Sequence, residues 1–302
     1  MKPARASAAP VSIGVAGRPR VSLLDYVALT KPRLNLLVVA TSAAGYYLGS
    51  PGGPLLWPMA RGVAGIALVA GGAAVLNQVL ERDTDALMRR TRSRPLPDAR
   101  VEPGDARLYG FALAVAGVGV LALGASIAAA LLAVATLGIY LVAYTPLKRR
   151  SSLATLVGAV PGALPPLIGW AAAEGRVSMG GWTLFAIVFL WQIPHFMAIA
   201  WLYRDDFAGA GFPMLPVVEP DGRRTGRQAL LYAAALLPVS VVPTFAGLSG
   251  WAYFWAAVVL GVGLLVLSAR FAVSRDDGRA RALFLGSIVY LPLLWVTMVW
   301  DH

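Results

Sequence analysis

Residues 108–145 contain no Asp, Glu, Lys or Arg over 38 consecutive positions. A bilayer core offers no water to backbone polar groups, so an apolar run of this kind predicts membrane-spanning helices. As a single helix it would measure about 57 Å, far more than the roughly 30 Å of the hydrocarbon core. We therefore expect two spans that meet at a tight turn at Gly124-Ala125-Ser126.

The rest of the chain repeats this pattern, since 58% of its 302 residues are hydrophobic and only 14% are charged. The uncharged run 228–269 divides in the same way near Gly247 to Gly250. Residues 1–24 are basic and lack an apolar core before a small-residue cleavage site, so we predict a disordered cytoplasmic arm rather than a cleaved targeting peptide. For residues 25–302 we predict an all-α, polytopic membrane domain with nine transmembrane helices: 27–48, 59–80, 107–124, 127–145, 153–173, 181–203, 228–246, 251–269 and 282–300.

Basic residues orient these spans, because cytoplasmic loops hold most of the Lys and Arg in membrane proteins. With the N-terminus inside, 24 of the 26 basic residues fall on the cytoplasmic side, and only Arg61 and Arg176 fall outside. The C-terminus is then predicted to lie outside. The net charge of +11 reflects orientation and attraction to anionic lipid, and no nucleic-acid partner is needed to explain it. The chain has no cysteine, which excludes disulfides and thiolate metal sites.

The stretch NQVLERDTDALMRRTRSRP, residues 77–95, places opposed charges at the end of the second span. Asn77, Glu81 and Asp85 are four residues apart and share one helix face, whereas Asp83 joins them only if the helix unwinds. Oxygen ligands without His or Cys suit a hard cation such as Mg²⁺. The alternative is an ordinary solvated loop, but polar groups within a span are expensive and usually functional.

Basic residues follow these acids and recur in a second inner loop, YTPLKRR, residues 144–150. Arginine and lysine side chains here could hold phosphate oxygens or could simply mark the cytoplasmic side. The candidates are Arg89, Arg90, Arg92, Arg94, Lys148 and Arg149.

A second acidic cluster lies in WLYRDDFAGAGFPMLP, residues 201–216, where Asp205 and Asp206 follow the sixth span. Two such clusters at the inner ends of even-numbered spans could bracket one diphosphate with metal between them. His195 lies within the same span, next to Pro194, and could be a ligand, an acid or base, or a hydrogen-bonded structural residue.

The fifth span is unusual because Pro161, Pro165 and Pro166 lie among its glycines, and we expect it to be kinked. Irregular backbone at this depth is tolerated mostly where protein or a cavity surrounds it.

The pattern Asn77-x-x-x-Glu81-x-Asp83-x-Asp85, with YTPLKR, WQIPHF and YRDDFAGAGFPMLP in this order, resembles the UbiA superfamily of intramembrane prenyltransferases. Within it, the segments are most similar to those of the branch that farnesylates heme. The resemblance covers about residues 25–300. It implies a nine-helix UbiA-type bundle around a central cavity that opens to the cytoplasmic face and sideways to lipid.

The same resemblance implies the reaction and its location. Farnesyl diphosphate would be the donor, with Mg²⁺ bridging its diphosphate, and heme B would be the acceptor substrate, giving heme O. The protein would lie in the lipid bilayer of a bacterial inner membrane with its active site at the cytoplasmic face. Partners would be proteins of heme A synthesis or terminal oxidase assembly.

The resemblance also assigns roles to residues. Glu81 replaces the more usual aspartate, and Asp205 and Asp206 are adjacent where the superfamily often spaces two aspartates four apart. The implied catalytic residues are Asn77, Glu81, Asp83, Asp85, Lys148 and Asp206, of which Glu81, Asp83, Asp85 and Asp206 would bind metal. The implied substrate-binding residues are Arg90, Arg94, Tyr144, Arg149, His195, Arg204 and Asp205.

Two other functions remain open. The chain could join a prenyl group to a quinone precursor or another aromatic acceptor. It could also be a multi-pass heme transporter or carrier, whose broken span and polar inner loops would look similar. Against transport, spans four to nine show no obvious inverted copy of spans one to three, and both acidic loops are predicted on one side.

Overall fold

The computed structural model describes residues 21–50 and 52–302, and this part of the chain forms helices and no strands. The all-α prediction is therefore confirmed. The long helices are α2 (Pro32–Leu48), α3 (Leu56–Leu80), α5 (Pro103–Gly124), α6 (Ile127–Gly138), α8 (Ala154–Glu174), α9 (Met179–Leu202), α12 (Arg223–Phe245), α13 (Trp251–Ser274) and α14 (Asp277–Trp300). The short ones are α1 (Leu23–Leu29), α4 (Arg82–Leu87), η1 (Ile139–Tyr144), α7 (Thr145–Leu147), α10 (Arg204–Gly209) and α11 (Leu215–Val218).

Within the described residues, eight helical segments are long and apolar enough to cross a membrane, and one of them joins α6, η1 and α7. Helix α2, with 17 residues, is the ninth long helix of the bundle. This arrangement confirms a multi-pass membrane protein. The predicted turns are confirmed as well, since α5 ends at Gly124 and α12 ends at Phe245, two residues before Gly247 adopts a φ of 71°.

The first span begins later than predicted. The chain breaks at Lys31, whose φ of 50° and ψ of 60° are left-handed, and Pro32 opens α2. Proline fits the first turn of a helix but disfavours helical backbone in the residue before it, so the break falls here. The predicted boundary at residue 24 lies inside α1, and residues 1–20 of the predicted arm lie outside the described residues.

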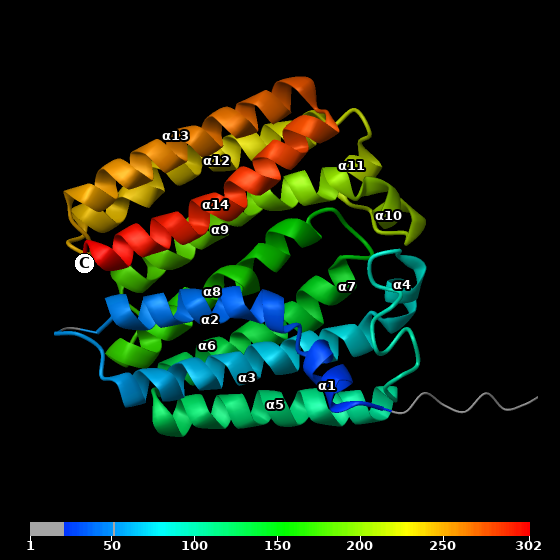
Figure 1. The fold of residues 1–302 in the computed structure, drawn as a ribbon, viewed down its shortest axis with the longest axis horizontal. Coiled ribbons are helices and arrows are strands. Elements are labelled where there is room, and N and C mark those ends of the chain that lie inside the picture. The colour runs from blue at the N-terminus through cyan, green and yellow to red at the C-terminus, as the bar shows by residue number, and fades with distance from the viewer. Residues whose placement is uncertain (1–20, 51) are drawn as a thin grey trace, which may run out of the picture.

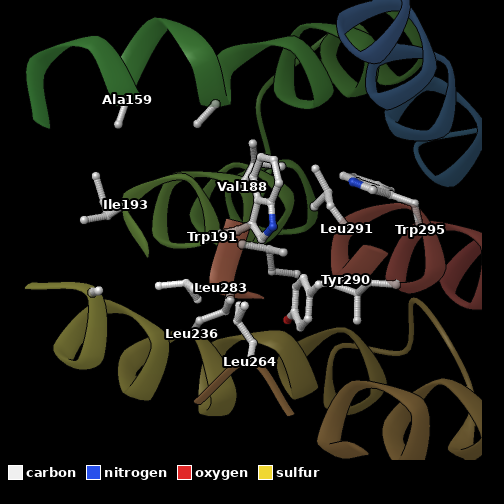
Figure 2. Packing of buried hydrophobic residues seen from close by; sticks show 14 of the residues in the cluster. Ala159, Val188, Trp191, Ile193, Leu236, Leu264, Leu283, Tyr290, Leu291 and Trp295 are labelled. Atoms are coloured by element: carbon white, nitrogen blue, oxygen red, sulfur yellow. The ribbon is translucent and has the colours of Figure 1, made fainter. Parts of the chain in front are cut away.

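The long helices pack in two groups (Figure 1). Helices α9, α12, α13 and α14 form one group, and α2, α3, α5, α6 and α8 form the other. Trp191 lies at the centre of the first group, among Leu236, Leu264 and Tyr290 (Figure 2). Contact between α8 and α9 joins the groups.

Helices α2 and α8 approach each other very closely. A Cβ atom at Gly45 would lie 2.1 Å from the carbonyl oxygen of Pro166, and one at Gly169 would lie 2.0 Å from that of Ser42. Only glycine fits at either position. Small residues of this kind let membrane helices pack backbone against backbone, which holds α2 beside the three-proline helix α8.

The irregular backbone lies in the fourth span, and the fifth span is regular. In the fifth span, helix α8 continues as one helical segment through Pro161, Pro165 and Pro166, although the sequence favours a kink there. The segment η1 is instead a π-helix, in which each N–H bonds to the carbonyl five residues earlier. Both the N–H and the hydroxyl of Thr145 bond to the carbonyl of Tyr140. Wide turns of this type often occur at functional sites, and η1 is followed by the three-residue helix α7 and then by Lys148.

Candidate active site

Short helices gather at one end of the bundle. Figure 1 shows α4, α7, α10 and α11 at the end opposite the C-terminus. These helices hold the three loops that the sequence predicts to be cytoplasmic and functional. The three loops therefore lie together at one end of the bundle, as the sequence analysis expects.

The first acidic stretch is built on a helix boundary. Helix α3 ends at Leu80 and α4 starts at Arg82, yet Glu81 N–H still donates to Asn77 (2.9 Å) and Asp85 N–H to Glu81 (2.8 Å). The three side chains are buried, with exposed fractions of 2% for Asn77, 4% for Glu81 and 1% for Asp85. Asp83 is exposed to solvent and does not join them.

Glu81 is paired with Lys148. The Lys148 ammonium donates to both carboxylate oxygens, at 3.1 and 3.3 Å. Burial lowers the pKa of Lys148, but Tyr144 and Glu81 outweigh it, so the pKa is raised overall and the side chain stays charged. Asn77 donates to Thr145 (3.1 Å), three residues before Lys148, and so ties the same two segments together.

Asp85 is paired with Arg94. The guanidinium Nη1 lies 2.7 Å from a carboxylate oxygen of Asp85, and the hydroxyl of Thr91 donates to the Asp85 carbonyl at 2.7 Å. The loop after α4 thus folds back onto its own helix. It brings a second cation to within bonding distance of a second buried carboxylate.

Lys31 is a third cation at this site, and the sequence analysis assigned it only to membrane orientation. Burial, then the positive charge of Arg94, lowers the pKa of Lys31 to about 8, while Glu81 and Asp85 oppose this shift. The left-handed turn before α2 places Lys31 in the field of both ion pairs. The Lys-Pro pair at the start of the first span is the sequence feature that marks it.

The second acidic loop packs against the first. Met88, after α4, belongs to a buried cluster with Phe207, Ala210 and Phe212 from the α10 region. The Arg90 guanidinium lies 5.4 Å from the ring centre of Tyr203, and the Lys148 ammonium lies 4.7 Å from that of Phe212. The structure therefore brings the two loops together, although Arg90 contacts aromatic rings here.

The acidic residues do not form a compact metal cage. Across residues 21–50 and 52–302, no group of three Asp, Glu or His side chains is close enough to hold an ion. Asp205 is exposed and Asp206 half-buried. Mg²⁺ usually takes one or two carboxylates and completes its shell with water and substrate phosphates. Glu81 and Asp85, buried and adjacent, fit that role, whereas the full predicted set of four carboxylates is not assembled.

Other predicted substrate-binding residues contact neighbouring side chains of the protein. Arg204 bonds to Asp277 (2.8 Å) and joins α10 to α14. Arg149 is exposed and donates to Thr84 (3.0 Å). Tyr144 stacks on Tyr140, with ring centres 5.5 Å apart.

His195 lies deeper in the bundle, between Trp191 and the α14 residue Phe284. Within the described residues, its hydrogen-bond partner is Ser287, and it forms no hydrogen bond with the acidic residues.

A groove of about 730 Å³ runs between α2 and α14. Its lining is almost entirely apolar and includes Leu36, Leu37, Trp295 and Trp300, with Arg33 at the same end as the acidic loops. An apolar chain lying in this groove would have its polar end near the charged site.

Comparisons with known proteins agree with this geometry. The protoheme IX farnesyltransferase of Solibacter usitatus is 45% identical to the chain, over 92% of the chain and 98% of its own length. That of Salinibacter ruber is 44% identical, over 92% of the chain and 99% of its own length. That of an Anaeromyxobacter species is 46% identical over 93% of the chain and 96% of its own length.

Solved structures share the fold. A structure described as digeranylgeranylglyceryl phosphate synthase is 15% identical with a TM-score of 0.79, covering 92% of this chain and 98% of its own. A UbiA homologue from Archaeoglobus fulgidus, bound to GPP and Mg²⁺, is 15% identical with a TM-score of 0.61, covering 91% and 99%. The model of the UbiA prenyltransferase family matches residues 38–294. The chain therefore belongs to the UbiA prenyltransferase family.

Proposed function

We propose that this protein transfers a farnesyl group from farnesyl diphosphate to the vinyl group of heme B, with addition of water, to give heme O. Two ion pairs on buried carboxylates, Glu81 with Lys148 and Asp85 with Arg94, carry the proposal. They lie at the end of the bundle where both acidic loops meet. Near-full-length similarity to protoheme IX farnesyltransferases supports the choice of donor and acceptor.

The ion pairs suit a site that receives a metal and a diphosphate together. Without substrate, each buried carboxylate is neutralised by a cation, which avoids an unpaired charge at membrane depth. When magnesium diphosphate enters, Glu81 and Asp85 would hold Mg²⁺, and Lys148 and Arg94 would turn to the phosphate oxygens. Lys31 supplies a further positive charge, so three cations face two carboxylates.

The chemistry then needs charge stabilisation and exclusion of water. The bond from C1 of farnesyl diphosphate to oxygen breaks, and its electron pair leaves with the diphosphate. Bound Mg²⁺ would supply part of the charge neutralisation for this leaving group. Lys148, Arg94 and Lys31 would stabilise the same developing charge with their positive charges.

The allylic carbon next bonds to the terminal vinyl carbon of heme. Water adds to the carbon on the porphyrin side and loses a proton, so farnesyl diphosphate, heme B and water become heme O and diphosphate. The apolar groove between α2 and α14 would hold the farnesyl chain away from bulk water. Asp206, on α10, would contribute a further carboxylate to Mg²⁺ from the second acidic loop.

We propose that the protein lies in a bacterial inner membrane. The N-terminus and the site would be on the cytoplasmic side and the C-terminus outside. The distribution of basic residues, 24 against 2, supports it. Delivery of the product to proteins of heme A synthesis or terminal oxidase assembly stays a prediction.

The test is product analysis. The purified protein in nanodiscs is incubated with heme B, farnesyl diphosphate and Mg²⁺, and the extracted hemes are separated by chromatography. We expect a more apolar heme that is heavier than heme B by one farnesyl group and one hydroxyl group (C15H26O), formed only when all three are present. Recovery of unmodified heme alone, from a protein that binds both substrates, would refute the proposal and favour a heme carrier.

A further inference from the structure

The imidazole ring of His195 is clamped on both faces. It stacks on Trp191 in α9, with ring centres 5.1 Å apart and planes 20° apart, and on Phe284 in α14, at 5.3 Å and 27°. Trp191 is held in turn, because its indole N–H donates to the backbone carbonyl of Ser287 at 2.8 Å. The plane of the His195 ring is therefore fixed by packing.

One of these nitrogens bonds to the Ser287 hydroxyl. Nδ1 of His195 lies 2.8 Å from Oγ of Ser287, and the same Oγ lies 2.6 Å from the carbonyl oxygen of Phe284. A carbonyl can only accept, and a serine hydroxyl has a single proton, so that proton points to Phe284. Oγ must then accept from His195, which places a proton on Nδ1. In the neutral ring the lone pair is at Nε2.

That lone pair is available. In the part of the chain that the structure describes, Nε2 of His195 has no hydrogen-bond partner, and it is not among the polar atoms sealed in the core. The neighbouring Gln192 donates from its amide nitrogen to the carbonyls of Ala159 and Val188, so it does not occupy Nε2 of His195.

We propose that Ser287 is a positioning residue that holds His195 in the Nδ1–H form and thereby presents Nε2 to the iron of the acceptor heme. The inference rests on the proposed function, which supplies the heme. Neutral imidazole is a common iron ligand, and a metal-binding histidine almost always donates its other N–H to a neighbouring acceptor. Ser287 is that acceptor here.

The location of the pair explains what iron binding would achieve. His195 precedes Tyr203 by two turns of α9, so it lies about 12 Å into the span from the end where the acidic loops meet. Iron bound to Nε2 of His195 would hold the porphyrin deeper in the bundle than the diphosphate site. Ser287 would set the orientation of the acceptor, and the charged loops would activate the donor.

Heme binding tests this role without turnover. The purified full-length protein is titrated with heme B in nanodiscs without farnesyl diphosphate, and affinity and axial-ligand absorption are recorded. We expect Ser287→Ala to weaken heme binding roughly 10–100-fold and to change the histidine-ligand spectrum, since it removes the partner of a metal-binding imidazole. The Trp191 hydrogen bond survives this change because it goes to a backbone carbonyl.

Further variants separate positioning from general damage. Ser287→Thr keeps the hydroxyl and should bind heme like the wild type. Ser287→Cys keeps the side-chain volume but accepts hydrogen bonds only weakly, so it should weaken heme binding as Ser287→Ala does. It replaces Ser287→Ala in the test if that variant does not fold. Ser268→Ala is the matched control, because Ser268 is a fully buried serine on α13 whose hydroxyl has no partner in the described structure. External imidazole should restore the spectrum in His195→Ala.

In turnover, Ser287→Ala should raise KM for heme and leave KM for farnesyl diphosphate unchanged. Wild-type affinity together with a wild-type axial-ligand spectrum in both Ser287→Ala and Ser287→Cys would overturn the inference. Failure of the wild-type protein to form farnesylated heme would instead overturn the proposed function, and the heme spectra distinguish the two failures.

Discussion

Replacing Lys148 by Met should damage both stability and activity, for separable reasons. The side chains of Lys148 and Glu81 are 14% and 5% exposed, so the substitution leaves a nearly buried carboxylate without its partner. Breaking such a pair costs about 3–5 kcal/mol, and partial exposure places this one near 3 kcal/mol. At roughly 2–4 °C per kcal/mol for a protein of this size class, we expect the melting temperature to fall by about 6–12 °C.

The double variant Lys148→Met with Glu81→Gln isolates the catalytic role. It removes both charges, so no unpaired ion remains and stability should return close to that of the wild type. Activity should not return, because the double variant lacks both a cation that would stabilise the leaving diphosphate and the Glu81 carboxylate that would hold Mg²⁺. Removing one such preorganised group typically lowers kcat by about 10²–10³.

Melting is followed by tryptophan fluorescence in one detergent, and activity by chromatography of extracted hemes. Arg150→Met is the matched control, because Arg150 is a nearby basic residue that is exposed, and it should change neither quantity appreciably. Recovery of activity in the double variant would show that the pair is only structural. An unchanged melting temperature in the single variant would show that the pair is not buried.

Three further outcomes follow. Asp85→Ala should abolish product while exposed Asp83→Ala retains most activity, and equal losses in product assays would contradict the different burial of the two carboxylates. The pKa of Lys31 is about 8, so its positive charge is present below that pH and lost above it. The KM for farnesyl diphosphate should therefore rise as the pH passes 8 in the wild type. It should not rise in Lys31→Arg, because arginine stays charged. Gly45→Leu should prevent α2 from packing on Pro166, and normal yield and melting temperature would refute that close contact.

The arrangement of spans was predictable from the sequence because it depends on local features. Uncharged length predicts the helices, and Gly124 and Gly247 mark turns within the two long apolar runs. The start of α2 was predicted too early, although the Lys31-Pro32 pair carries a local reason for a break. Local sequence gave no reason to expect a π-helix in η1, since its apolar residues have no distinguishing pattern.

The site was predictable in its residue types and less so in its contacts. Helical spacing brings Asn77, Glu81 and Asp85 together, and the structure buries all three. The partner of Asp85 is Arg94, nine residues along the chain, but the pairing of Glu81 with Lys148 spans 67 residues and depends on tertiary packing. The contact of Arg204 with Asp277 has the same cause, and it takes a predicted substrate-binding arginine toward α14.

The most direct test of this account is a structure of the protein with Mn²⁺ and an unreactive farnesyl diphosphate analogue, with the metal located by anomalous scattering. The account predicts the metal beside Glu81 and Asp85, the diphosphate between the α3–α4 boundary and α10, and the Lys148 and Arg94 side chains turned from their carboxylates to phosphate oxygens. A diphosphate bound elsewhere, or Asp85 and Asp206 facing separate compartments, would contradict it.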